Sequence, residues 1–422
     1  MVLVAAAMVA VMAMAALSID VVTLYLANAD AQRSADAAAL AAARVLSATG
    51  VTGDPANASG SWPLASNAAT QVAQAVANQN LVSGTIPKSV NVNINNTTPL
   101  FAVNPIVSVT VVSANLPTFF SRIWGNKSAG VSATATAEAY NPSNSGAYTA
   151  STSMVPVQPR CVKPWIVPNI EPQTGSTLVG PSDGSISNPG IQLNYAGTGN
   201  GIIGEQFTLQ SACTGTNCTV VQTAGLKAGT TYLQYMPADV QADSVAVSTA
   251  PGCAISGYYQ EAIAGCDQNT VYACGGVAGA TTLADLSLNR GAETAAATQC
   301  LINAPGNDSL NTATYPFIIE TGLDNPLRAG GVKGVNSGDV ISVSNSIVTI
   351  PIMNGSAVPT GSLTPGVTIV GFLQAFVQQV NDVAGVENPV VTVLNVSGCS
   401  NAATQQGVTG SSPVPVRLIN YP

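Results

Sequence analysis

Hydrophobic residues are concentrated at the beginning of the chain. From Met1 to Ile19 there is no charged residue, and Ser18 has the only polar side chain. Strong helix formers continue to residue 47, and the first helix breaker is Gly50. The pattern predicts one unbroken helix over residues 1–48, about 70 Å long, whose apolar start exceeds the ~30 Å hydrocarbon core of a bilayer.

The second half of this helix is amphipathic. At about 100° per residue, Asp30, Arg33 and Arg44 lie within about 60° of one another, and Asp36 lies on the same flank. The opposite face consists of Ala31, Ala35, Ala38, Leu40, Ala42 and Leu46. Such a smooth face lets another backbone approach closely. It favours equally an anchor helix that continues outside the membrane and a stalk that packs against identical helices.

The apolar start admits three interpretations. A cleaved secretory signal would open with basic residues and carry an apolar run of about 7–15 residues, whereas this run is longer and no basic residue precedes it. A buried globular helix of this length would be unusual. We therefore expect a membrane anchor or a filament core, and the direct apolar start is what removal of a basic leader, or trimming, would leave.

The next region has the pattern of a small α+β module. Ala and Val recur at three- and four-residue spacing over residues 64–80, which predicts a helix. Alternating β-branched residues predict strands at 88–96, 101–114 and 129–140. We expect residues 49–140 to fold as one helix against three or four strands, which resembles a pilin head; any small α+β domain would give the same pattern.

The rest of the chain is predicted to be rich in strands. Residues 141–157 are a Ser/Asn/Pro linker. Residues 158–422 contain strand patterns separated by Gly and Pro, together with a short helix at 257–266 and a longer helix interrupted at Gly291. The predicted fold class is α+β, with a long N-terminal helix, a small module and a β-rich, sandwich-like domain held by disulfides.

One string within the first helix resembles a known family. SIDVVTLYLANADAQRSADAAALAAARVL is similar to the N-terminal signature of TadG-like proteins of the tight-adherence (Tad) pilus system, which has an apolar helix, an aspartate, a tyrosine and a Q-x-x-ADAAALAAA block. The matching positions are Asp20, Tyr25, Gln32 and the block from Ala35 to Ala43. A second similar segment, LPTFFSRIWGNKSAGVSATATAEAY, spans residues 116–140.

The resemblance implies a pilin-like protein with an extracytoplasmic body. It would be inserted in the inner membrane as a precursor, handled by Tad-type assembly machinery, and then displayed on the cell surface. The sequence departs from type IV pilins at Ala5, where those proteins usually have a glutamate; the first acidic residue of the helix is Asp20.

Composition narrows the function classes. Charged residues make up 8% of the 422 residues, the net charge is −8, and there is no histidine. So few basic groups argue against a nucleic-acid partner. Without histidine the chain lacks the commonest general base and the commonest transition-metal ligand. We therefore expect no enzymatic activity, no cofactor and no metal.

The eight cysteines all follow residue 160: Cys161, Cys213, Cys218, Cys253, Cys266, Cys274, Cys300 and Cys399. An even number in an extracytoplasmic context predicts disulfides, and there is neither a C-x-x-C pair nor a histidine to suggest a metal. Cys213 and Cys218 flank a turn-like TGTN and are the best candidates for a local pair.

Two loops have metal-binding residues, and each has a simpler explanation. Asp183, Ser185 and Ser187 have the D-x-S-x-S spacing of a metal-ion adhesion site, but no apolar strand precedes them and Pro181 stands close by, so a surface turn is favoured. The Asp/Asn-rich loop 303–311 lacks the EF-hand spacing. The scattered acidic residues, such as Glu261 and Glu293, form no distinctive pair.

The first helix is therefore the candidate functional element. A carboxylate in an apolar helix is costly and usually has a partner, so Asp20 either marks the outer membrane boundary or pairs with a neighbouring subunit through its N-terminal amine or a hydroxyl such as Thr23. The candidate assembly residues are Met1, Leu3, Ala5, Met8, Met12, Leu17, Asp20, Leu24, Tyr25, Ala35, Asp36 and Leu40.

Three hypotheses follow from these patterns. The first is a subunit that polymerises with copies of itself through this helix and displays its β-rich outer domain. The second is a membrane-anchored accessory protein of a Tad machine. The third is a tethered surface adhesin or hydrolase, with an unknown host or surface ligand.

Overall fold

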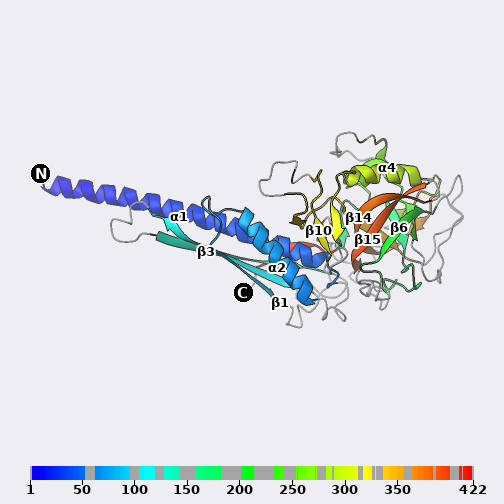
Figure 1. Ribbon diagram of the computed structural model, residues 1–422, viewed down its shortest axis with the longest axis horizontal. Coiled ribbons are helices and arrows are strands. Elements are labelled where there is room, and N and C mark those ends of the chain that lie inside the picture. Colours follow the sequence, from blue (N-terminus) through cyan, green and yellow to red (C-terminus); the bar gives the residue numbers. More distant parts are fainter. Residues whose placement is uncertain are drawn as a thin grey trace.

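The protein is elongated, with a helix that projects from a larger body (Figure 1). The computed structural model describes residues 2–52, 62–95, 104–118, 128–141, 157–181, 201–212, 232–240, 253, 255–270, 272, 282–287, 289–311, 317–325, 328, 336–355, 364–383, 386–399, 408–410 and 412–420.

The predicted long helix is present as α1, Val2–Ser47. Its alanine-rich second half packs against α2, Trp62–Gln79, and against the first sheet. The buried side chains at this contact are mostly alanines, which allow close approach of the backbones: Ala27, Ala31, Ala35, Ala38, Ala39, Ala42 and Ala43 of α1, with Ala65, Ala69, Ala73 and Ala77 of α2.

The first sheet has the strand order β1–β2–β3–β17, and all its pairs are antiparallel. The strands are β1 (Ser89–Asn95), β2 (Ile106–Pro117), β3 (Ser128–Ala139) and β17 (Val416–Leu418). Alternate residues of β2 and β3 face α1, which is the period-two pattern that the sequence predicted. We call this sheet, α2 and the second half of α1 the stalk module.

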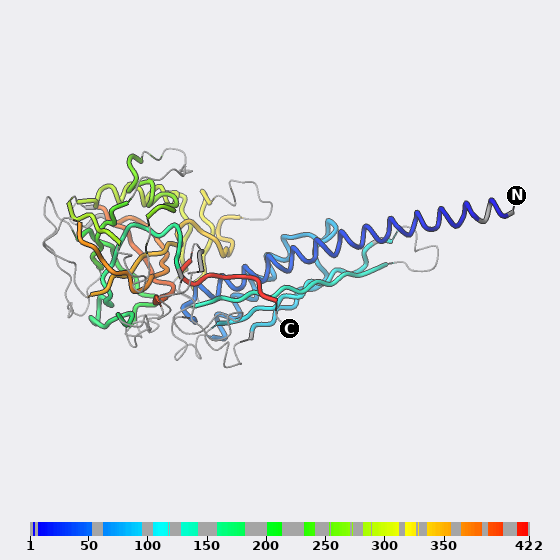
Figure 2. The backbone as a smooth tube through the Cα atoms, turned by 180° about the vertical axis from the view of Figure 1, so that it is seen from behind, coloured from blue at the N-terminus to red at the C-terminus, as the bar shows by residue number. Residues whose placement is uncertain are grey.

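The C-terminal strand does not follow the expected division of the chain. Residues 158–422 were predicted to form the outer domain, yet β17 returns to the stalk module and extends its sheet beside β3 (Figure 2). Arg417 of β17 donates two hydrogen bonds, of 3.1 and 3.0 Å, to the buried carboxylate of Glu138 in β3. This ion pair and the three residue pairs between the two strands hold β17 against β3.

The β-rich character of the second part is confirmed, but its arrangement is a closed barrel and not a sandwich. Six strands close in the order β12–β14–β15–β6–β7–β5. They are β5 (Trp165–Pro168), β6 (Gln206–Ser211), β7 (Tyr232–Pro237), β12 (Ile347–Met353), β14 (Ile369–Val383) and β15 (Val386–Gly398). The ring closes because β5 pairs with β7 on one side and with β12, almost two hundred residues later, on the other. Strand spacing alone cannot predict such distant pairings.

Short elements surround the barrel, and we call the whole unit the head. They are β4 (Val157–Pro159) with β16 (Val408–Gly410), β8 (Thr282–Leu283) with β13 (Gly366–Val367), the three-stranded sheet β9 (Ser309–Asn311), β10 (Ile318–Glu320) and β11 (Val340–Ile341), and the helices α3 (Tyr258–Ala264) and α4 (Gly291–Leu301). The predicted interruption at Gly291 is the start of α4.

The prediction of disulfides is confirmed for two pairs. Cys161 bonds Cys266 and Cys253 bonds Cys300, so both bridges fasten α3 or α4 to neighbouring chain segments. Cys399 is also disulfide-bonded. Cys213, Cys218 and Cys274 lie outside the described residues, so the local Cys213–Cys218 pair stays a prediction.

Candidate functional site: the projecting helix and its junction with the head

The first half of α1 is an apolar rod that the rest of the chain leaves largely uncovered. Most of its large hydrophobic side chains are exposed, from 48% at Ile19 to 83% at Leu3, whereas Leu24, close to the body, is half-buried. We call residues 2–26 the projecting segment. Up to residue 15, adjacent positions such as Met8 and Val9 are both exposed and point about 100° apart, so the exposed apolar surface there is not confined to one face. Apolar surface on every side requires lipid or other helices around it.

Length and composition are consistent with insertion in a membrane. Among the described residues, α1 is the helix long and apolar enough to cross a bilayer, with a mean hydropathy of 2.1 in its most apolar window. The projecting segment alone would extend about 37 Å, compared with about 30 Å for a hydrocarbon core. The remaining turns of α1 are packed against the stalk module.

The candidate assembly residues separate into two groups. Leu3, Met8, Met12, Leu17 and Tyr25 are exposed on the projecting segment, whereas Leu24, Leu40 and Asp36 are half-buried and Ala35 is fully buried in the stalk module. Met1 and the side chain of Ala5 lie outside the described part.

The smooth alanine face is not open to identical helices. Ala31, Ala35 and Ala38 have no exposed surface, because the chain's own β2, β3 and α2 cover them. The small side chains that suggested a stalk for neighbouring helices are therefore explained by packing within one chain. Contacts with other helices are left to the projecting segment.

Asp20 is buried, with 3% of its surface exposed, and it has a partner within its own chain. The Thr23 hydroxyl, considered above as a partner from a neighbour, instead donates to the Asp20 backbone carbonyl at 2.8 Å. Asp20 thus lies where the body begins to cover the helix, as the boundary interpretation expects. Its pairing with another subunit stays a prediction.

The polar flank of α1 connects the helix to the stalk module. Gln32 donates to Asp36 at 2.8 Å and to the Thr134 carbonyl of β3 at 3.3 Å. Asp30 lies 3.5 Å from Arg33 and accepts a bond from the Ser83 amide. Exposed pairs of this kind add little stability each, but they fix the rotation of α1 over the sheet.

The end of α1 is fixed to the barrel by buried polar contacts. Gly50 has a φ of 73°, and a Cβ there would lie 2.5 Å from the Ile203 side chain. Asn395 of β15 donates to the Ser47 carbonyl at 2.6 Å and to the Thr52 hydroxyl at 2.7 Å. Carbonyls at a helix end have no partner within the helix, so the head supplies one. The helix is joined to the head by a fixed contact at this point.

Sequence reasoning missed this junction. Gly50 was predicted only as a helix breaker, and Asn395 carried no signal except the chance sequon Asn-Val-Ser. Asn141 was assigned to the linker, yet its side-chain amide donates to the Thr52 and Val396 carbonyls at 3.0 and 3.1 Å. Buried asparagines in irregular segments look like ordinary loop residues until their partners are known.

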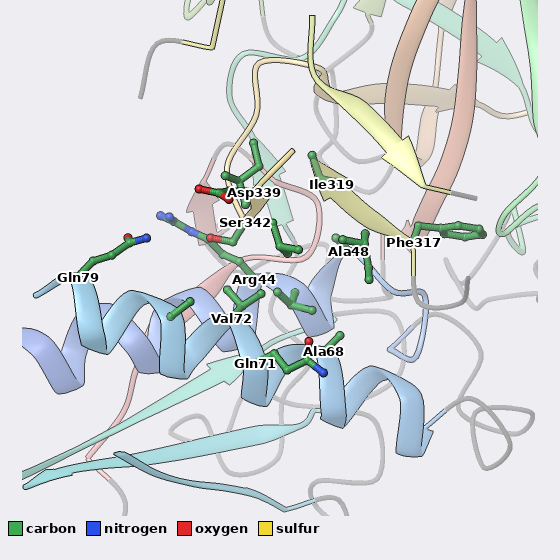
Figure 3. A pocket seen from close by; sticks show the side chains of 15 residues that line it. Arg44, Ala48, Ala68, Gln71, Val72, Gln79, Phe317, Ile319, Asp339 and Ser342 are labelled. Carbon is green, nitrogen blue, oxygen red and sulfur yellow. The ribbon is translucent and has the colours of Figure 1, made fainter. Parts of the chain in front are cut away.

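A pocket of about 380 Å³ lies beside the junction (Figure 3). The end of α1, one side of α2 and the strands β10 and β11 form its walls. The lining is mainly apolar, with Val72, Phe317 and Ile319, and Arg44 and Asp339 lie on the same side of it (Figure 3). It could accept an apolar group, but it contains no pair of catalytic side chains.

The head contains buried charged groups whose contacts are structural. Lys163 donates to the carbonyls of Ala262, Ile263 and Gly265 at 3.3, 2.7 and 2.6 Å, and so caps the end of α3. Burial lowers the pKa of Lys163 to about 7. Burial, together with the neighbouring Glu171 carboxyl, raises the pKa of Glu205 to about 9.

The candidate metal loops do not gain support. The Asp308 carboxylate accepts bonds from the Gly322 amide, the Asn325 amide and the Ser344 hydroxyl, so it serves to anchor loop 303–311. Asp183, Ser185 and Ser187 fall outside the described residues. In the part of the chain that is described, no cluster of three or more His, Cys, Asp or Glu residues could hold a metal ion.

Comparison with known proteins agrees with the geometry of the first helix. Residues 1–45 match the family model described as "Tad: Putative Flp pilus-assembly TadE/G-like". Searches of curated proteins and of solved structures found no match to the chain. The matched residues cover the whole projecting segment and nearly all of α1, while the similarity of segment 116–140 stays a prediction. The N-terminal region of the chain is therefore similar to TadE/G-like Flp pilus-assembly proteins, which confirms the resemblance to TadG-like proteins over residues 1–45.

Proposed function

We propose that this chain is a pilin-like structural subunit that polymerises through its projecting segment. The observation that carries the proposal is the change of environment along α1. Up to residue 15 the described large apolar side chains are exposed on all sides, from Ala16 one face is covered by the chain's own body, and from Ala27 onward alanines are packed into the stalk module. Such a helix offers one end to lipid or to other helices and uses the other end to hold its own body.

The two possible surroundings of the projecting segment, lipid and other helices, correspond to two stages in the life of the subunit. As a precursor, the projecting segment would lie in the inner membrane, with the stalk module and head outside the cytoplasm. After assembly by Tad-type machinery, the same apolar surface would be covered by the helices of neighbouring copies. The fixed junction at Gly50 and Asn395 would then set where each head is displayed around the filament.

A membrane-anchored accessory protein of the Tad machine is the second candidate. The observation in its favour is that the alanine face, the best surface for close helix packing, is already used within the chain. In that case lipid would remain around the projecting segment. A tethered adhesin is the third candidate, and it would act through the head alone.

Met12→Asp tests the role of the projecting segment. A charge at the middle of an apolar span costs about 2.5–3.5 kcal/mol on insertion scales, so the variant should be lost from the membrane and from sheared surface filaments. Leu64→Asp is the matched control, because Leu64 is about as exposed, 50% against 59%, but lies on α2 of the stalk module.

The location of the parent protein separates the candidates. Electron microscopy and immunolabelling of sheared surface material should find it along filaments, with mass spectrometry identifying its N-terminal peptide. Retention of all the protein in the membrane fraction would favour the accessory role. Normal assembly of the Met12→Asp variant would contradict both the filament-subunit function and the accessory function.

A further inference from the structure

The sheet of the stalk module has two open edges in the described part of the chain. On one side β1 pairs with β2 and has no second neighbour. On the other side β17 pairs with only three residues of β3, Ala137 to Ala139. The preceding residues, 128–133, continue that edge beyond the end of β17.

Hydrogen bonds show which backbone groups of β3 face outward. The Thr136 carbonyl accepts the Ile419 amide and the Thr134 carbonyl accepts Gln32, so both point away from β2. Groups on an antiparallel strand alternate sides with a period of two. The amide and carbonyl of Ser132 therefore also point outward, at an edge where the side chains are small; beyond it, the bulge opposite Gly130 interrupts the regular ladder.

Neither edge carries a charged residue or a proline, although the β2–β3 ladder has a bulge between Ser113 and Leu116 of β2. Proteins commonly protect edge strands with charged residues, especially Lys, or with Pro. The sequence of β1 is SVNVNIN and that of residues 128–133 is SAGVSA, so both are free of charge and proline. The exposed side chains Asn91, Asn93 and Ser132 are polar and would not oppose a neighbouring strand.

We propose that the β3 edge of one copy, residues 128–133, binds the β1 edge of a second copy, so that the stalk sheets join side by side. The inference rests on the proposed subunit function and names the surface that would accompany the helix contacts. Since β1 and β3 both run antiparallel to β2, the joined strands would be parallel when the two copies have the same orientation. Every projecting segment then points the same way, as a common membrane or filament axis requires.

The positions of the two edges also fix an offset between copies. β1 lies beside residues 106–112 of β2, whereas residues 128–133 lie beside residues 111–117. Joining them shifts each copy by roughly five residues, or about 17 Å, along the strand direction. The two edges are different surfaces, so the contact is heterologous, and a shifted heterologous contact generates an open helical array.

Cysteine cross-linking tests the contact in the full-length protein. The double variant Asn93→Cys/Ser132→Cys should give a ladder of dimers, trimers and larger species on non-reducing gels after mild oxidation of surface filaments or membranes. Adjacent strands place Cα atoms within the range that a disulfide needs. Each single variant should give no ladder, because β1 does not meet β1 and β3 does not meet β3. Gln71→Cys/Ser132→Cys, with one cysteine on the exposed side of α2, is the matched control.

Ser132→Pro gives an independent test. Its amide faces outward, so proline removes a donor from the open edge while the ladder to β2 is kept. This variant should lower the amount of polymer at least tenfold, whereas Ser132→Ala should not, with both retaining the parent's melting temperature. The cross-linking result does not depend on whether the proline variant folds.

The outcomes distinguish this inference from the proposed function. Suppose that filaments contain the chain but the Asn93→Cys/Ser132→Cys variant gives no ladder. The edge contact would then be wrong and the subunit function would stand. A ladder of equal strength in the Gln71→Cys/Ser132→Cys control would lead to the same conclusion. A ladder in membranes without filaments would support the contact and contradict the filament. Normal polymer from a folded Ser132→Pro variant would also overturn the contact.

Discussion

At the scale of single residues, Glu205 is the most unusual ionisable group in the described chain. The residue is 3% exposed, and neither carboxyl oxygen has a partner at hydrogen-bonding distance and angle among the described groups. Its neighbour Glu171 already accepts the amides of Gln173 and Thr174. Burial and this second carboxyl favour the protonated form, which is why the pKa of Glu205 rises to about 9.

Glu205→Gln should therefore stabilise the head at alkaline pH. Between about pH 4.3 and pH 9 the unfolded chain has released the Glu205 proton while the folded chain keeps it. The folded state binds more protons, so the free energy of unfolding falls as pH rises through this window. Glutamine removes this dependence, and the variant should melt several degrees above the parent at pH 8 and close to it at pH 4.

Thermal unfolding followed by circular dichroism at pH 4, 6 and 8 checks this expectation. Glu387→Gln is the control, because Glu387 is exposed at the start of β15. Parallel melting curves for the parent and Glu205→Gln across the pH range would contradict the assignment of a buried, protonated carboxyl.

Asn395 determines how the helix meets the head. Asn395→Ala leaves the Ser47 carbonyl and the Thr52 hydroxyl without the side-chain amide that they contact now. A buried group left without a partner costs about 1–3 kcal/mol, so we expect a lower melting temperature and faster proteolysis between α1 and the barrel. Asn354→Ala, at an exposed position after β12, should change neither property. An unchanged proteolysis pattern in Asn395→Ala would mean that the junction is held by other contacts.

At the scale of elements, adjacent alanines of α1 have different environments. Ala38 has no exposed surface and lies against the stalk sheet and α2, whereas Ala37 is only partly covered. Ala38→Leu must place three extra carbon atoms in a close-packed contact, which typically costs about 1–3 kcal/mol. Ala37→Leu makes the same chemical change about 100° around the helix and should be close to neutral. Chemical denaturation of the two variants measures the difference, and equal stabilities would show that the α1 contact is loosely packed.

At the scale of the whole molecule, the projecting segment is separable from the folded body. The buried cluster of the stalk module begins at Ala27, and the junction lies beyond Ser47. Deletion of residues 1–19 should therefore give a soluble monomer whose melting temperature is within a few degrees of that of the parent in detergent. Size-exclusion chromatography and calorimetry test this. Filaments or a membrane-bound population from the deleted chain would contradict assembly through the projecting segment.

Several elements could be predicted from the sequence because their patterns are local. The long run of helix formers up to Gly50 gave α1, and strict alternation gave β1, β2 and β3 close to their actual bounds. The even number of cysteines predicted disulfides, and two pairs confirm them. The string from Ser18 to Leu46 indicated the TadE/G-like family, since that family's signature is carried by contiguous residues.

The sequence alone determined that a long helix with an uncharged, apolar start precedes a β-rich body that contains no histidine, because composition and local period are enough for those conclusions. Only the tertiary structure decided what covers the alanine face, where Asp20 lies, that β5 and β12 close a barrel, and that β17 returns to β3. These features depend on contacts between residues far apart in the chain. A small side chain has the same local pattern whether its neighbour is lipid, another subunit or its own sheet.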